Sequence, residues 1–132
     1  MRKKAFLFLL LNILFLVGCS NEYVVFSGES NHWDGKYSVN IDGNEEYGIY
    51  TFRYKNSDGN TEFKSLEIVI NQSNGRTSRK EEIRKGGRIE MTSSCMGCAV
   101  INKDEAITVT IKWDNKYEET FTLKSKNDNE KR

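Results

Sequence analysis

The chain has 132 residues, of which 20 are basic and 19 are acidic, and its formal net charge is +1. This length fits one small domain, and the balanced, interspersed charges exclude a strongly basic nucleic-acid-binding surface. The chain contains no proline, so its turns must rest on Gly, Asn and Asp. We expect a monomer that does not bind nucleic acid.

The N-terminal segment has the pattern of a bacterial lipoprotein signal. Residues 2–4 are basic, residues 5–17 are apolar except for Asn12, and residues 16–19 read LVGC. At about 1.5 Å per residue the apolar run spans roughly 20 Å, which is short for a hydrocarbon core of about 30 Å. We therefore expect cleavage between Gly18 and Cys19 and lipidation of Cys19 by acyl chains, which would hold the chain on the extracytoplasmic face of the cell membrane. A buried N-terminal helix and an uncleaved anchor are the alternatives.

Signal cleavage would define the parts of the mature chain. Removal of residues 1–18 takes away three basic side chains, so the net charge changes from +1 to −2. We expect residues 19–22 to form a lipidated tether, residues 23–124 one β domain and residues 125–132 a flexible polar tail.

Alternating apolar side chains predict short strands in the first half of the domain. The first strand covers residues 23–26. Turn signals at 42–44, 56–60 and 71–76 separate the segments that follow. In each segment, apolar residues of one parity recur: Trp33, Tyr37, Val39 and Ile41; Tyr50, Phe52 and Tyr54; Leu66, Ile68 and Ile70.

The second half continues this pattern after one ambiguous segment. Residues 77–85 are charged and fit either a short helix or an exposed edge strand. Alternation then resumes in three segments: Ile89 and Met91; Ile107, Val109, Ile111 and Trp113; Tyr117, Phe121 and Leu123. Seven or eight such strands predict an all-β fold, an antiparallel β-sandwich, for which an immunoglobulin-like arrangement is one candidate and a small barrel the alternative.

Cys95 and Cys98 form a C-x-x-C motif, the one compact reactive motif of the chain. With Cys19 committed to lipid they are an even pair in an oxidising compartment, so we expect a local disulfide. A redox-active dithiol is the second interpretation, but the flanks 91–94 and 99–101 look like strands and lack the helix N-terminus that such a site uses. A soft-metal site with nearby methionines is the third, but a structural zinc site needs four ligands.

Three weaker patterns suggest other sites. Residues 42–46 and 58–62 each read D-x-N-x-E, a spacing that suits Ca²⁺, but neither continues as an EF-hand loop, and D-G-N is ordinary turn chemistry. His32 is the only histidine, and no G-x-S-x-G elbow accompanies it, so we expect a surface residue. Tyr50 and Tyr54 would form an aromatic face for sugar or peptide or, as we expect, part of the core. We predict no catalytic residue, cofactor or metal site.

The segment FSGESxxWxGxY at residues 26–37 and the ending IKWDxKxExTF at residues 111–121 resemble those of small lipoproteins from Bacillus-like Gram-positive bacteria. That family has no assigned activity, so the resemblance implies a location and no catalytic residues. Together with the signal pattern, it predicts a non-enzymatic binding or cell-envelope module anchored through Cys19, with an envelope protein or a glycan as partner. Thiol redox chemistry or soft-metal handling by Cys95 and Cys98 is the alternative.

Overall fold

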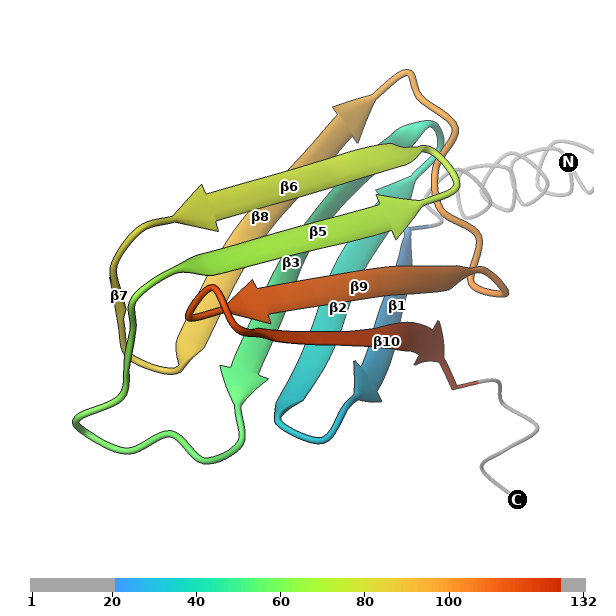
Figure 1. Cartoon of the computed structure of the whole chain (residues 1–132). Helices are drawn as coiled ribbons and strands as arrows, with labels where there is room; N and C mark the ends of the chain where they lie inside the picture. The colour runs from blue at the N-terminus through green and yellow to red at the C-terminus, as the bar shows by residue number, and fades with distance from the viewer. Residues whose placement is uncertain (1–20, 127–132) are drawn as a thin grey trace, which may run out of the picture.

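The computed structural model describes residues 21–126, which form ten β-strands and no helix (Figure 1). Gly18, Cys19 and the tail after residue 126 lie outside the described residues. Within the described range, no helix has the length and apolar character needed to cross a membrane. The strands are β1 (Glu22–Glu29), β2 (Trp33–Asp42), β3 (Glu45–Tyr54), β4 (Glu62–Phe63), β5 (Leu66–Gln72), β6 (Gly75–Glu81), β7 (Arg84–Lys85), β8 (Arg88–Met96), β9 (Ala106–Trp113) and β10 (Tyr117–Ser125).

Eight strands form one curled antiparallel sheet in the order β6-β5-β9-β10-β1-β2-β3-β8, and β4 and β7 form a second, two-stranded sheet. In Figure 1 the half containing β6, β5, β9 and β10 lies across the half containing β1, β2, β3 and β8. The two halves therefore form two layers around one core, which confirms the predicted all-β sandwich. The layers are joined through the pairing of β10 with β1.

The junction between the layers depends on Gly28. Only two residue pairs join β1 to β10, Phe26 with Ser125 and Ser27 with Lys124. A Cβ atom placed on Gly28 would collide with the backbone carbonyl of Thr122 on β10. A residue without a side chain is needed where two backbones approach this closely.

The core follows the predicted alternation. Strand β2 buries Trp33, Gly35, Tyr37, Val39 and Ile41 on one face and exposes much of the other, as a half-buried antiparallel strand does. Ten core side chains have no measurable exposure: Phe26, Trp33, Tyr37, Val39, Phe52, Ile89, Ile107, Val109, Ile111 and Leu123.

Two local predictions are settled by the structure. The ambiguous residues 77–85 lie in strands β6 and β7 and in the bend 82–83 between them. Strand β6 is a sheet edge whose side chains are almost all exposed, which suits its charged sequence. The strand-like reading of residues 99–101 is wrong, because residues 97–105 form a loop. Gly97, with φ of 70°, turns the chain out of β8, and Ile101 is buried without belonging to a strand.

The molecule has two ends, which we call the N-terminal pole and the distal pole. The N-terminal pole holds the start of β1, the turn between β2 and β3, and the loop 97–105. The distal pole holds the turn 30–32, the loop 55–61 and the turn 114–116 (Figure 1). Strand β1 runs from one pole toward the other over eight residues, about 26 Å at roughly 3.3 Å per residue.

Candidate functional site

A pocket of about 490 Å³ opens at the distal pole, and we call it the distal pocket. Its walls combine aromatic rings with acidic and amide groups. The rings come from the ends of several strands and their turns: His32, Tyr54, Phe63, Trp113 and Tyr117.

The rings belong to an aromatic cluster that is built on the buried Trp33. The Trp33 ring centroid lies 5.2 Å from that of Tyr54, 5.5 Å from that of Phe63 and 5.8 Å from that of Trp113. Tyr117 stacks on Trp113 at 5.3 Å and is 46% exposed. Tyr117, expected in the core by its parity, is therefore at the mouth of the pocket. Trp33 and Trp113 are the two tryptophans of the chain.

The remaining lining residues are Asp58, Asn60, Thr61, Glu62 and Asp114. Oδ1 of Asp58 accepts a hydrogen bond from the backbone N–H of Asn60 at 2.8 Å, which closes an Asx turn in the loop. Oδ1 of Asp114 accepts one from the backbone N–H of Lys64 at 2.8 Å. Among residues 21–126, none of these three carboxylates forms a salt bridge with a lysine or arginine.

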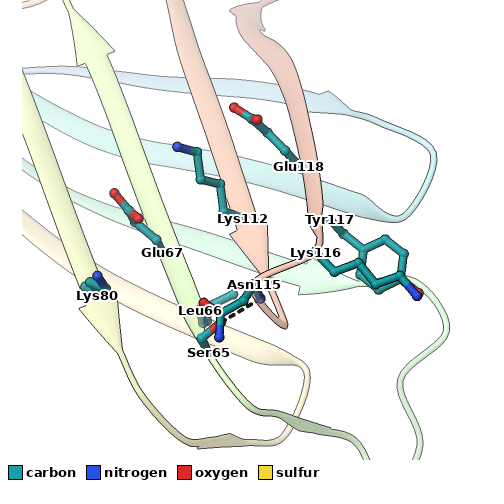
Figure 2. Close-up of a pocket in the computed structure, with 9 residues that line it drawn as sticks. All are labelled: Ser65, Leu66, Glu67, Lys80, Lys112, Asn115, Lys116, Tyr117 and Glu118. Carbon is teal, nitrogen blue, oxygen red and sulfur yellow. Dashed lines mark hydrogen bonds between the residues drawn. The ribbon is translucent and has the colours of Figure 1, made fainter.

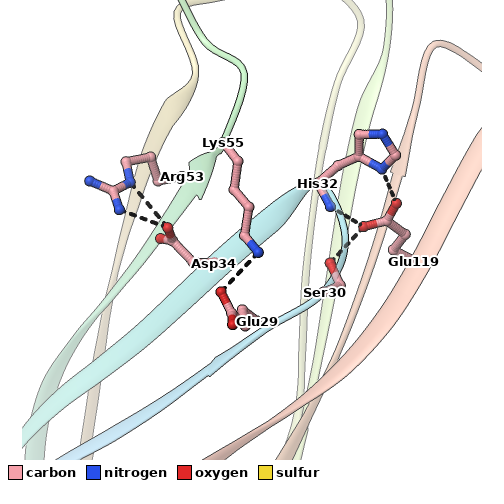
Figure 3. Close-up of polar contacts among 7 residues, drawn as sticks. All are labelled: Glu29, Ser30, His32, Asp34, Arg53, Lys55 and Glu119. Atoms are coloured by element: carbon pink, nitrogen blue, oxygen red, sulfur yellow. Dashed lines mark hydrogen bonds and ion pairs between the residues drawn. The ribbon is translucent and has the colours of Figure 1, made fainter.

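His32, which lines the pocket, is held in place by hydrogen bonds with Glu119 of β10, and Glu119 also binds Ser30 (Figure 3). Oε1 of Glu119 accepts hydrogen bonds from Ser30 Oγ at 2.6 Å and from the backbone N–H of His32 at 2.9 Å. Oε2 lies 2.5 Å from Nδ1 of His32. Partial burial raises the pKa of Glu119, but the hydrogen bonds from Ser30 and His32 outweigh burial, so the pKa is lowered overall.

The ionised Glu119 determines the tautomer of His32. A carboxylate only accepts hydrogen bonds, so Nδ1 of His32 must carry the proton that it shares with Oε2. In the neutral imidazole, Nε2 is then a free lone pair, and Figure 3 shows it directed away from Glu119. Neutral His32 thus contributes a hydrogen-bond acceptor to the lining of the distal pocket, and its side chain is 45% exposed, as the predicted surface position requires.

The order of this cluster differs from that of a catalytic triad. In a serine hydrolase the imidazole lies between the serine and the acid, and it removes the proton of the serine. Here Glu119 lies between Ser30 and His32. The hydroxyl of Ser30 donates to the carboxylate and has no imidazole to activate it, so the cluster orients His32.

The carboxylates next to the pocket differ from those inside it. Asp34 accepts hydrogen bonds from Nε and Nη2 of Arg53 at 3.1 and 2.8 Å, and Glu29 pairs with Lys55 at 2.8 Å (Figure 3). The pairing with Lys55 lowers the pKa of Glu29. The neighbouring surface is therefore neutralised by its own cations, whereas the carboxylates in the pocket are not.

The predicted disulfide lies at the N-terminal pole. Cys95, the second-last residue of β8, forms a disulfide with Cys98 in the following loop. Beside it Glu46 is only 2% exposed, the one buried charged residue among those described. Glu46 accepts hydrogen bonds from Tyr37 Oη at 2.7 Å and from the backbone N–H of Ile101 at 2.6 Å. Burial, and then the bond to Glu46, raise the pKa of Tyr37.

The two D-x-N-x-E segments lie in different surroundings, and Asp58, Asn60 and Glu62 of the second line the distal pocket. Glu46 of the first points into the core toward Tyr37 and Ile101. Asp58 of the second organises its own turn. In the part of the chain that the structure describes, no group of three His, Cys, Asp or Glu residues is arranged to hold a metal ion.

A second cavity, of about 320 Å³, lies over the outer face of β5, β9 and β10 (Figure 2). Its charges alternate across neighbouring strands, because Glu67 is paired with both Lys80 and Lys112, and Lys112 is paired with Glu118. Opposite charges on adjacent strands stabilise a sheet. These charged pairs therefore have a structural role in the sheet, and the distal pocket is the stronger candidate for a functional site.

The chain was compared with models of protein families, with curated proteins and with solved structures, and none of the three comparisons gives a match.

Proposed function

We propose that the chain is a non-enzymatic, lipid-anchored binding module that presents the distal pocket away from the membrane. One observation carries this proposal: the pocket lies at the pole opposite the start of β1. Cys19 precedes β1 by three residues, which reach at most about 10 Å when extended. A lipid on Cys19 would hold the N-terminal pole near the membrane and leave the distal pole about 26 Å further out.

The anchor is tested by membrane fractionation of cells that express the full chain or Cys19→Ala. We expect the full chain in the membrane fraction, globomycin to block its processing, and Cys19→Ala to leave the membrane. A double variant, Cys95→Ser with Cys98→Ser, is the matched control, because it removes the other two cysteines and should stay membrane-bound. Unchanged processing and partition of Cys19→Ala would refute the anchor.

The rival function, thiol redox chemistry or soft-metal handling by Cys95 and Cys98, makes a different prediction. A structural disulfide stays oxidised in exported protein and resists the glutathione pool. We expect alkylation followed by mass spectrometry to find the pair bonded and free of metal. A pair that exchanges readily, at a potential near that of known oxidoreductases, would favour the rival function.

A further inference from the structure

We propose that the distal pocket binds an organic cation, through an ammonium or guanidinium group. This inference rests on the proposed binding function and adds the chemical class of the ligand. It follows from three features of the lining: the charge, the hydrogen-bonding capacity and the ring faces.

The charge of the lining is one-sided. Asp58, Glu62 and Asp114 contribute three carboxylates, and no lysine or arginine lines the pocket. Each of these side chains has at least one oxygen that accepts no hydrogen bond within the described residues. A concave site with charge of one sign raises the local concentration of ions of the opposite sign.

The hydrogen-bonding groups are mostly acceptors. In the neutral imidazole of His32, Nε2 is an acceptor because Glu119 holds the proton on Nδ1. The hydroxyl of Thr61 lies 3.3 Å from Oδ1 of Asp58 and donates to it. An ammonium group carries three donors and a guanidinium five, and neither has an acceptor. A neutral glycan would find donors in this lining only at the amide of Asn60 and at the hydroxyls of Tyr54 and Tyr117, and it would gain nothing from the three carboxylate charges.

The aromatic walls suit the same ligand. A cation within about 6 Å of a ring centroid is attracted to the face of the ring. Nζ of Lys116 lies 5.4 Å from the centroid of Tyr117, so an ammonium group reaches this ring, and a bound cation would share the ring with Lys116 or displace it. The half-exposed Tyr117 offers ring surface next to the carboxylates, whereas Trp113 is only 4% exposed and supports Tyr117 from behind.

Tryptophan fluorescence tests this inference directly, since both tryptophans belong to the cluster behind the pocket. The full chain, kept in a nonionic detergent at constant ionic strength, is titrated with butylamine, with the N-acetyl methylamides of lysine and arginine, and with neutral chitotriose. We expect a saturable change with the cations and none with chitotriose. Tighter binding of the amino-acid derivatives than of butylamine would identify a protein side chain as the source of the cation.

Two matched variants locate the effect. Glu62→Gln removes one charge from the pocket and should weaken cation binding about two- to five-fold, the range expected for an exposed ion pair. Glu118→Gln removes the same charge from the outer face of β10, in the second cavity, and should leave binding unchanged. Equal effects of the two variants would overturn the assignment to the distal pocket.

The remaining outcomes separate the ligand class from the proposed function. Binding of chitotriose without binding of the cations would overturn the cation inference and leave the binding module in place. The absence of a response to every cation would also overturn the inference. The proposed function would then be tested separately, the anchor by membrane fractionation and the binding of a partner at the distal pocket by crosslinking in cells.

Discussion

At each pole of the molecule a glutamate carboxylate accepts hydrogen bonds from two other residues, but the two carboxylates have different roles. At the N-terminal pole, Glu46 accepts hydrogen bonds from Tyr37 and Ile101, is almost fully buried and joins β3 to the loop 97–105. At the distal pole, Glu119 accepts hydrogen bonds from Ser30 and His32, but it lies near the surface. The carboxylate of Glu46 holds the loop 97–105 against the core. That of Glu119 holds the imidazole of His32, which lines the distal pocket. The buried carboxylate therefore stabilises the core, and the partly exposed one positions a residue of the candidate site.

Removing the buried bridge should have the largest effect. Glu46→Ala leaves the hydroxyl of Tyr37 and the N–H of Ile101 without acceptors in the core, so the free energy of unfolding should fall by about 3 kcal/mol. Urea denaturation followed by circular dichroism measures this loss. Glu45→Ala, at a half-exposed neighbouring position, is the control and should change stability by about 0.5 kcal/mol or less. If Glu46→Ala lowered the free energy of unfolding by less than about 1 kcal/mol, Glu46 would not be an important stabilising group of the N-terminal pole.

The disulfide should contribute the next largest effect at the same pole. Cys95 and Cys98 close a loop of about four residues, for which loop-closure entropy predicts a stabilisation of about 2 kcal/mol. Cys95→Ser with Cys98→Ser should therefore lower the free energy of unfolding by this amount, and reduction of the unaltered chain should do the same. If neither treatment shifts the urea midpoint, the disulfide does not stabilise this pole.

At the distal pole we expect a smaller effect that depends on pH. The pKa of Glu119 is lowered in the folded state, so its contribution is complete above the ordinary glutamate pKa and is lost as pH falls through the folded-state pKa. Glu119→Gln should remove this acid-sensitive part, about 1 kcal/mol. Thermal unfolding between pH 6 and pH 3 measures it, with Glu118→Gln as control. Parallel pH curves for Glu119→Gln and the unaltered chain would contradict the role of the ionised carboxylate.

The smallest effect is expected at the exposed ion pair beside the pocket. Arg53 and Asp34 are 65% and 31% exposed, and such pairs contribute little to stability. Arg53→Met should therefore change the free energy of unfolding by less than about 0.5 kcal/mol in urea denaturation. A loss as large as that of Glu46→Ala would mean that surface pairs, and not the buried bridge, stabilise the layers.

The strands could be predicted from the sequence because a half-buried strand repeats every two residues, as residues 107–113 do. The bridges could not, because Glu119 and His32 lie 87 positions apart and periodicity does not show which residues meet. One signal was present. Glu46 shares the parity of the buried Tyr50 and Phe52, and Glu119 shares that of Phe121 and Leu123. A carboxylate on the core-facing side of a strand marks a site where other groups must satisfy it.

The central claim is that the distal pole, and not the N-terminal pole, meets a ligand. Two tyrosines of matched exposure test it: Tyr117 at the distal pocket is 46% exposed, and Tyr47 on the outer face of β3 is 44% exposed. A photoreactive amino acid at either position, irradiated in intact cells and followed by mass spectrometry of the recovered chain, detects adducts of any size. We predict adducts at position 117 that Glu62→Gln weakens, and none at position 47. Adducts at position 47 alone, or identical adducts at both positions, would contradict the account.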